Sequence, residues 1–201
     1  METREKILEV AMEHFTRLGV RYVTMDDIAR AAGMSKKTIY QEFKDKEQLV
    51  FNTFENSMRQ DQEFFTKLNE ESNGALEHFV EISKYIRSRF SNINPLVFSE
   101  IQRYYPKCWQ LFEHYKHNCA IKTITDTIDQ GKAEGYFRPE IDSNILAMIR
   151  LEQISSTFDP TKFPPAKFNI IEVQMAIMDH FIHGLLTDKG RELFYKINNQ
   201  D

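Results

Sequence analysis

Apolar residues recur at helical spacing along almost the whole of the 201-residue chain. We find no alternating apolar and polar stretch that is long enough to predict a sheet, and no internal repeat. A first helix, stopped by Gly19, is predicted from these apolar positions: Ile7, Leu8, Ala11, Phe15 and Leu18. The pattern predicts an all-α protein.

Two short helices with a tight turn between them follow the first helix. Thr24 can cap the second helix while Asp27, three residues on, reciprocates in a capping box. Gly33 can take the left-handed conformation that ends this helix. The small Ala29 lets the third helix approach, and Ile39 is spaced to pack against it. This arrangement predicts a helix-turn-helix.

The third helix begins after Ser35, a good N-cap, and it carries Ile39 and Phe43 inward. A fourth helix opens at Asp45, with Gln48 as the partner of this cap, and extends to about residue 72, a length of about 40 Å. Further helices are predicted at about 75–90, at about 95–104, from Pro106 to the sequence GKAEGYF, at about 142–157 and at about 168–187. The expected architecture is an N-terminal three-helix DNA-binding domain, residues 1–47, joined to a C-terminal helical bundle, residues 48–201, with about nine helices in total.

The last two predicted helices are apolar over most of their circumference, which is typical of helices that are buried on more than one side. Ile145, Met148 and Ile149 in the first, and Ile177 and Phe181 in the second, illustrate this pattern. One face can serve the chain's own core and the other a second copy of the chain. The alternative is a single deep core without a partner.

Composition limits the class of protein. Hydrophobic residues make up 41% of the chain, which has only seven glycines and six prolines, so a helical core is favoured over disorder. No apolar run approaches the roughly 18 to 20 residues that span a bilayer, and the N-terminus lacks the apolar stretch of a secretory signal. Cys108 and Cys119 are expected to be reduced thiols. We therefore expect a cytoplasmic protein without a membrane segment.

Charge is distributed unevenly. The chain has a formal net charge of -4, but residues 1–50 carry nine basic and nine acidic side chains, so the remainder is the acidic part. Residues 21–46 carry six basic and four acidic groups. The helix-turn-helix can therefore be locally positive within an acidic chain, and the local field governs an encounter with DNA.

The residues from Thr24 to Leu49 follow the pattern T-x-x-x-I-A-x-x-A-G-x-S-x-x-T-I-Y-x-x-F-x-x-K-x-x-L. This pattern resembles the DNA-binding domain of the TetR (tetracycline repressor) family, and it covers about the first quarter of the chain. The resemblance implies a homodimer, formed through a four-helix bundle of the last two long helices of each copy. It also implies a pocket for a small-molecule effector and an operator of double-stranded DNA with inverted repeats.

The resemblance also suggests individual DNA contacts. Thr24, Tyr40 and Lys46 correspond to backbone-contacting positions, and the N-cap Ser35 can add a phosphate contact. The candidates for base or groove contact are Lys36, Lys37, Thr38 and Gln41. The alternative interpretations are that Thr24 and Ser35 are helix caps only, that Tyr40 is a core aromatic, and that the lysines form an ordinary solvated face.

Four aromatic residues of the body are candidates for the wall of an apolar effector pocket, although plain core packing explains each of them equally: Phe98, Tyr104, Trp109 and Phe112. The pairs His114 and His117, and His180 and His183, have a spacing that can hold a metal, but no further ligand completes a tetrahedral set, so no metal is expected.

Taken together, the sequence predicts a ligand-responsive transcriptional regulator, a repressor that a small apolar or aromatic molecule releases from DNA. No cofactor and no catalytic residue is predicted, because no phosphate-binding glycine loop or nucleophile elbow is present. The alternatives are a regulator controlled by a partner protein or a metal, and a helical small-molecule-binding protein with enzymatic activity.

Overall fold

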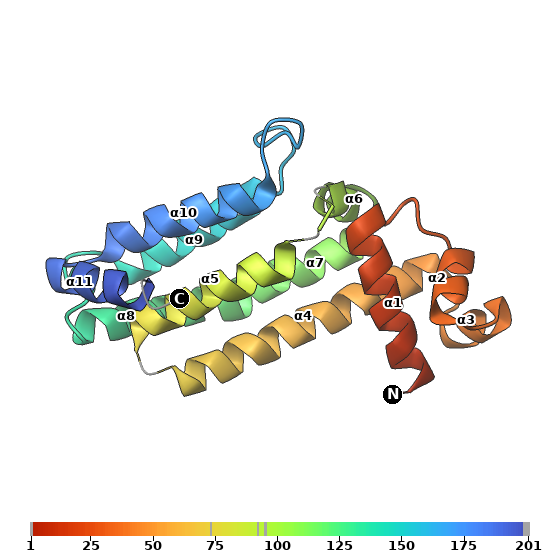
Figure 1. Ribbon diagram of the computed structural model, residues 1–201, viewed down its shortest axis with the longest axis horizontal. Helices are drawn as coiled ribbons and strands as arrows, with labels where there is room; N and C mark the ends of the chain where they lie inside the picture. The colour runs from red at the N-terminus through yellow and green to blue at the C-terminus, as the bar shows by residue number, and fades with distance from the viewer. Residues whose placement is uncertain (1, 73, 92, 95, 199–201) are drawn as a thin grey trace. The chain divides into compact units, whose positions relative to one another are not determined.

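The computed structural model describes residues 2–72, 74–91, 93–94 and 96–198, and over these residues the chain is helical, with no strand (Figure 1). The prediction of an all-α protein is confirmed. Phe137 and Leu186 form one isolated antiparallel bridge. The helices are α1 (Thr3–Leu18), α2 (Met25–Ala32), α3 (Lys36–Glu42), α4 (Lys46–Glu71), α5 (Ala75–Phe90), α6 (Leu96–Tyr104), α7 (Pro106–Tyr115), the π-helical segment η1 (Lys116–Ala120), α8 (Ile121–Ala133), α9 (Ser143–Thr157), α10 (Ile170–Leu185) and α11 (Asp188–Asn198).

The chain forms two compact units. Unit 1 comprises Met1–Glu63 and Asn92–His114, and unit 2 comprises Phe64–Ser91 and Tyr115–Asp201. The helix α4 begins in unit 1 and ends in unit 2. The division predicted from the sequence, after residue 47, concerns the extent of the DNA-binding fold, and it stays a prediction.

Unit 1 has its own hydrophobic core, to which α1, α2, α3, α4, α6 and α7 contribute. Ile7, Phe15, Ile28, Ile39 and Phe43 are fully buried in it. Leu18 is the exception among the apolar positions predicted for α1, because its side chain is 45% exposed at the C-terminal end of the helix. The apolar stripe of α1 therefore ends one turn earlier than the sequence predicted.

Unit 2 is built from α5, η1, α8, α9, α10 and α11. The helices α9 and α10 lie side by side and pack against each other, while α8 packs on α9, and α5 contacts both α8 and α10 (Figure 1). Aromatic rings fill the core where α5 and α10 meet, with the ring centroids of Phe79 and Phe181 5.9 Å apart and those of Phe79 and Phe137 also 5.9 Å apart.

The single long helix predicted from Pro106 is continuous to Ala133, but its middle residues are π-helical rather than α-helical, which the sequence did not predict. The structure has α7 and α8 with the π-helical segment η1 between them. The wider turn places Lys116 in a buried position, where its Nζ lies 3.2 Å from Glu152 Oε1 and 3.5 Å from Ser155 Oγ on α9. These partners are tertiary, so helical periodicity alone does not reveal the segment.

The helices predicted as the last two correspond to α9 and α10, but they are not the last, because α11 follows. Thr187 initiates α11, since its Oγ1 accepts a hydrogen bond from Gly190 N–H at 3.1 Å. Phe194 is buried in the core of unit 2, and Leu193 and Ile197 pack against this core. With α11, and with α7 and α8 counted separately on the two sides of η1, the described residues contain eleven α-helices, where about nine were predicted. Residue 95, included in one predicted helix, lies outside the described residues.

None of the helices in the described part of the chain combines the length and the apolar character needed to cross a membrane.

Candidate nucleic-acid interface

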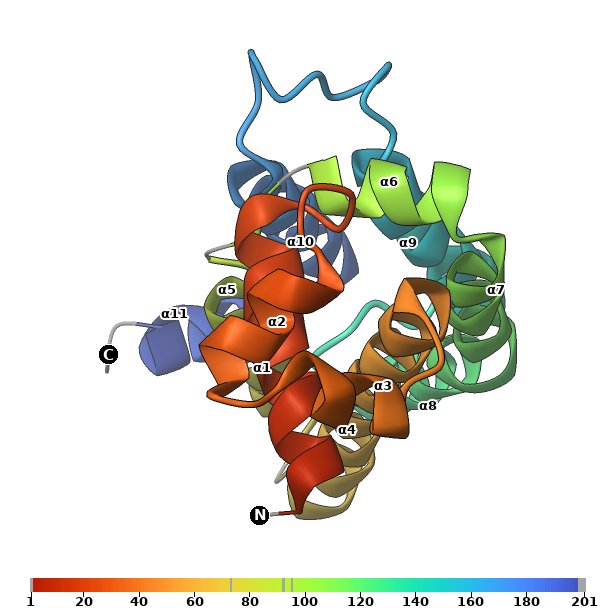
Figure 2. The same ribbon diagram turned by 90° about the vertical axis from the view of Figure 1, so that its right-hand side faces the viewer.

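The turn between α2 and α3 has the geometry that the sequence predicted. Gly33 has a φ of 67° in the left-handed region, and its N–H donates to Arg30 O at 3.2 Å. Met34 N–H then donates to Ala29 O at 2.9 Å, which satisfies another terminal carbonyl of α2. The helices α2 and α3 pack against each other and follow α1, as Figure 2 shows. The helix-turn-helix is confirmed.

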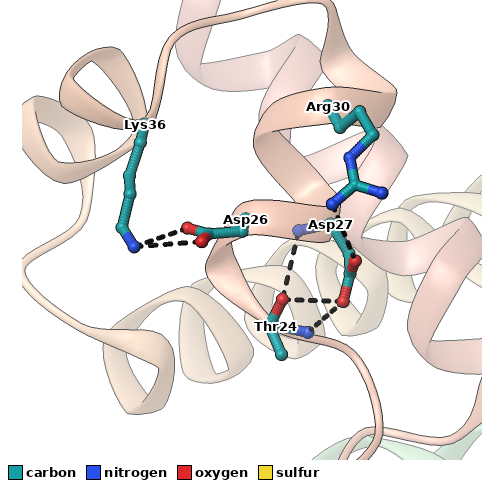
Figure 3. A network of polar contacts seen from close by, with 5 residues as sticks. All are labelled: Thr24, Asp26, Asp27, Arg30 and Lys36. Carbon is teal, nitrogen blue, oxygen red and sulfur yellow. Dashed lines mark hydrogen bonds and ion pairs between the residues drawn. The ribbon is translucent and has the colours of Figure 1, made fainter.

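The start of α2 is held by a reciprocal capping box (Figure 3). Asp27 N–H donates to Thr24 Oγ1 at 3.2 Å, and Thr24 N–H donates to Asp27 Oδ2 at 3.0 Å. The hydroxyl of Thr24 also donates to the same carboxylate at 2.7 Å, and these bonds lower the pKa of Asp27 below its usual value. The predicted capping role of Thr24 is confirmed, and its side chain remains exposed at the surface.

The start of α3 is capped in a simpler way. Ser35 Oγ accepts from Thr38 N–H at 3.1 Å and lies 2.9 Å from Thr38 Oγ1. Thr38 is consequently half-buried, and its hydroxyl faces the cap. Of the predicted DNA contacts, Ser35 and Thr38 thus form one local hydrogen-bonded pair, which fixes the N-terminal end of the recognition helix.

Four predicted contact residues on α3 are exposed: Lys36, Lys37, Tyr40 and Gln41. Tyr40 is 46% exposed, whereas Ile39 beside it is fully buried, so Tyr40 lies on the outer face of α3 rather than in the core. These four side chains are therefore exposed on α3, and their contacts with DNA stay predictions.

Lys36 has a specific partner that the sequence analysis missed. Its Nζ lies 2.7 Å from Asp26 Oδ1 on α2 (Figure 3). This carboxylate, first through its hydrogen bond and then through its charge, raises the pKa of Lys36. The pair ties the first turn of α3 to the first turn of α2, and it neutralises one of the two lysines at the start of the recognition helix. The signal was present in the excess of acidic residues at the start of α2, which are commonly assigned to the helix dipole alone.

Lys46 is not an isolated cation. Its Nζ donates to Arg21 O at 3.1 Å, and burial lowers its pKa, although the nearby Glu100 carboxylate partly opposes this effect. Arg21 N–H in turn donates to Glu100 Oε2 at 3.1 Å. The loop before α2 is therefore held from two sides, by the first residue of α4 and by α6.

The side chain of Arg21 lies on Tyr104. The guanidinium carbon is 4.4 Å from the ring centroid, and Nη1 donates to Tyr104 Oη at 3.3 Å. Tyr104 is 45% exposed, so in unit 1 its ring forms a surface contact with the helix-turn-helix loop. Sequence spacing does not reveal such a contact between residues that are 83 positions apart. Tyr22, which is 80% exposed next to Arg21, is a further outward residue that the sequence analysis missed.

The other predicted pocket residues also lie in unit 1. Trp109 packs against the core of this unit, and its ring centroid is 5.2 Å from that of Phe112, while Phe98 is partly buried. None of the four lines the cleft of about 530 Å³ in unit 2, which is bounded by Val80, Ser83, Lys84, Arg87, Met175, Ala176, Met178, Asp179, Ile182 and Phe194. The assignment of a pocket to Phe98, Tyr104, Trp109 and Phe112 stays a prediction.

His183 belongs to the second of the two histidine pairs noted in the sequence. His183 Nε2 lies 3.5 Å from Asp179 Oδ1, and its ring meets that of Phe194 at 5.3 Å. Within residues 2–72, 74–91, 93–94 and 96–198, no three histidine, cysteine or acidic side chains are placed to hold a metal ion.

A capped helix-turn-helix with an outward polar α3, followed by a helical body, defines the class of helix-turn-helix DNA-binding proteins. Residues 7–53 match the family model of bacterial regulatory proteins, tetR family. The uncharacterized HTH-type transcriptional regulator YvaF of Bacillus subtilis (strain 168) is 24% identical over 168 residues, which are 83% of this chain and 87% of YvaF.

Solved structures share the fold. A TetR-family transcriptional regulator from Agrobacterium tumefaciens has a TM-score of 0.71 at 16% identity, covering 92% of this chain and 97% of that chain. The transcriptional regulator FadR from Bacillus subtilis, in complex with stearoyl-CoA, has a TM-score of 0.62 at 19% identity. The match covers 90% of this chain and 98% of the FadR chain. The predicted resemblance is confirmed: residues 7–53 of this chain match the tetR family model, and the chain shares its fold with a TetR-family regulator.

Proposed function

We propose that this protein is a dimeric repressor that binds an inverted-repeat operator in the cytoplasm and releases it when a small molecule binds. The observation that carries the proposal is the outer face of α3, where Lys37, Tyr40 and Gln41 are exposed while Ile39 and Phe43 anchor the helix in the core. A helix held in this way presents the same side chains to the major groove each time it docks. No enzymatic step is part of the proposed function.

We assign separate roles to the predicted DNA-contacting residues. Lys37 and Gln41 are proposed to read base edges, because both are exposed and neither forms an ion pair or a side-chain hydrogen bond with the described residues. Thr24, Ser35, Tyr40 and Lys46 are proposed to contact the phosphate backbone, and Thr38 to stay close to the groove through its bond with Ser35. Lys36 can contact DNA only if it gives up its ion pair with Asp26, so its net contribution to the free energy of DNA binding is expected to be small.

The proposed dimer uses α9 and α10. On α9, Ile145 is 57% exposed, Met148 is 42% exposed and Ile149 is 45% exposed, so one face of this helix presents apolar side chains that the protomer does not cover. A contiguous apolar face of this kind is typical of a protein–protein interface. A second copy related by a two-fold axis would cover it and would place two recognition helices for an inverted repeat.

The effector is proposed to be a small molecule that favours a state of the protein with lower affinity for DNA. The predicted wall of Phe98, Tyr104, Trp109 and Phe112 supports an aromatic or apolar effector, and Trp109 supplies a reporter because it is the single tryptophan of the chain. A ligand that releases DNA is expected to change Trp109 emission, and Trp109→Phe should abolish this signal while release is kept. Release without any change of emission would contradict this location.

The central experiment selects duplexes from a random pool with the full-length protein and measures the sedimentation of the free protein. We expect an inverted repeat and a dimer. Lys37→Ala or Gln41→Ala should change which bases are preferred, while Lys122→Ala, an exposed lysine of unit 2, should not. Selection of no sequence, or tight binding of a palindrome by a monomer, would contradict the proposal.

A further inference from the structure

Arg150, on α9 in unit 2, is a buried cation that forms no ion pair with any of the described residues. It is 2% exposed, and among the described residues no hydrogen-bond acceptor meets its Nη1. Its Nη2 donates only to the sulfur of Met178 at 3.5 Å, and its guanidinium carbon lies 5.7 Å from the ring centroid of Phe181. Burial lowers the pKa of Arg150 to about 10, so the group remains charged at neutral pH. A buried charge that keeps so few polar contacts is costly unless a partner joins it.

Other unsatisfied polar atoms lie along the same helix contact. Gln153 is one turn from Arg150 on α9, and its Oε1 is buried without a partner. Across the contact, Gln174 on α10 donates its Nε2 to Thr157 Oγ1, while its Oε1 is buried without a partner. Since Gln174 and Met178 are four residues apart on α10, and Arg150 and Thr157 seven apart on α9, these groups follow one line between the two helices. This line is a polar strip inside an otherwise apolar contact.

The strip adjoins the cleft of unit 2 through one side chain. Met178 contacts Arg150 with its sulfur, and the same residue lines the cleft of about 530 Å³. This volume lies within the range of about 300–1,000 Å³ that is typical of small-molecule sites. Methionine is flexible and changes its rotamer readily, so Met178 can act as a movable wall between the cleft and the guanidinium.

The lining of the cleft defines the chemistry of an occupant. Val80, Ile182 and Phe194 provide apolar surface, and Lys84, Arg87 and Asp179 give the lining a formal excess of one positive charge. We propose that Arg150 receives the carboxylate of an amphiphilic monoanion whose apolar part occupies the cleft between α5, α10 and α11. A monoanion matches the single buried guanidinium, since a dianion would leave a buried excess of negative charge. A planar carboxylate also fits the fork of an arginine.

This cleft is a second site, separate from the wall predicted in unit 1. The role of its ligand as an effector rests on the proposed regulatory function, whereas the binding site does not. The test therefore begins with binding to the full-length protein without DNA. Sodium decanoate and 1-decanol, matched in chain length, are titrated by calorimetry below the concentrations at which they self-associate. We expect decanoate to bind about tenfold to a hundredfold more tightly, as charge-assisted hydrogen bonds predict.

Arg150→Met tests the residue, and Arg138→Met is the matched control, because Arg138 is an exposed arginine of the same unit. Arg150→Met should remove the preference for decanoate and leave the affinity for decanol unchanged, while Arg138→Met should keep the preference. Equal affinities of the two probes for the wild type, or a preference that survives in Arg150→Met, would overturn the proposal.

If Arg150→Met does not fold, a measurement on the wild-type protein tests the same proposal. The Nε–Hε signal of Arg150, assigned by its loss in Arg150→Lys, should shift saturably with decanoate and not with decanol, and an unshifted signal would overturn the proposal. Operator binding is measured separately on the ligand-free protein. If the wild type binds its operator but shows no preference for decanoate, the proposed binding site is wrong and the regulatory function stands. If it prefers decanoate but binds no operator, the proposed regulatory function is wrong and the binding site stands.

Discussion

Unit 1 and unit 2 differ in how completely their polar side chains are hydrogen-bonded. In the helix-turn-helix of unit 1, the capping side chains Thr24, Asp27 and Ser35 all have partners within three residues, and Lys36 has one across the turn. In the described part of the chain, the buried side-chain atoms without a hydrogen-bond partner all belong to unit 2: His78 Nε2, Thr125 Oγ1, Arg150 Nη1, Gln153 Oε1 and Gln174 Oε1.

The difference indicates a division of tasks. A recognition helix must present the same surface at each encounter, so its ends are fixed by short, satisfied hydrogen bonds. Unsatisfied buried polar groups carry a desolvation cost, which a ligand with complementary groups would reduce. Unit 2 therefore has more to gain from a bound molecule than the helix-turn-helix has.

The largest expected effect concerns tertiary packing in unit 2. A Cβ at Gly190 would lie 2.1 Å from Tyr136 O, a backbone atom that cannot move independently. Gly190→Ala is expected to lower the free energy of unfolding by about 3 kcal/mol, in the manner of an overpacked core. Urea denaturation followed by circular dichroism measures this change, and an unaltered midpoint would contradict the close approach of α11.

The matched change in unit 1 is Gly33→Ala, where a Cβ meets nothing within 4 Å but the φ is +67°. Here only the left-handed backbone opposes the substitution, at about 1 kcal/mol. Gly33→Asn should recover part of this loss, because asparagine tolerates the conformation better. A loss at Gly33 as large as that at Gly190 would remove the distinction between local and tertiary control.

The capping box gives a comparable effect with a pH dependence. Thr24→Ala is expected to cost about 1 kcal/mol at neutral pH, while Thr24→Ser should retain most of the cap. Because the pKa of Asp27 is lowered in the folded protein, its stabilisation is complete above the unfolded value and is lost as the pH falls through the folded value. The difference between wild type and Thr24→Ala should therefore narrow below about pH 4. A difference that stays constant from neutral to acidic pH would contradict this coupling.

A smaller effect is expected from Lys46, and it concerns DNA rather than stability. Lys46→Ala should weaken binding to all duplexes alike and reduce the slope of log affinity against log salt by about 0.9, the contribution of one phosphate contact. Filter binding or fluorescence anisotropy at several salt concentrations measures this slope. Unchanged binding to every duplex would show that Lys46 serves only to hold Arg21.

The smallest effect is expected at the exposed pair of Lys36 and Asp26. Asp26→Asn breaks the ion pair at the surface, so the midpoint of thermal unfolding should not change measurably. The same substitution frees Lys36 and removes a negative charge beside the groove-facing helix, so DNA binding should tighten slightly at low salt. Weaker binding would indicate that Asp26 positions Lys36 for its DNA contact.

The local features of the helix-turn-helix were predictable from the sequence. Thr24 with Asp27, Ser35 and Gly33 each act within a few residues, through a cap or a single backbone conformation, and all four predictions agree with the structure. The outward face of α3 was predictable for the same reason, since Ile39 and Phe43 determine which side of a short helix faces inward.

Contacts between distant segments were not predictable in this way. The contact of the Tyr104 ring with Arg21, which lies 83 residues earlier in the chain, has no signal in the sequence pattern. The segment η1 interrupts an otherwise regular helical pattern and carries Lys116, which lies beside Glu152 and Ser155. Such features depend on which helices become neighbours.

Short-range periodicity and a compact motif are enough to predict the helical class, the caps of α2 and α3, and the resemblance to the TetR family. The packing of the helices is needed to see that α11 covers the core of unit 2, that Lys36 pairs with Asp26, and that Arg150 is buried without an ion pair among the described residues. The physical reason is that burial and pairing are properties of several chain segments at once. An arginine such as Arg150 has the same local pattern whether it faces water or the interior.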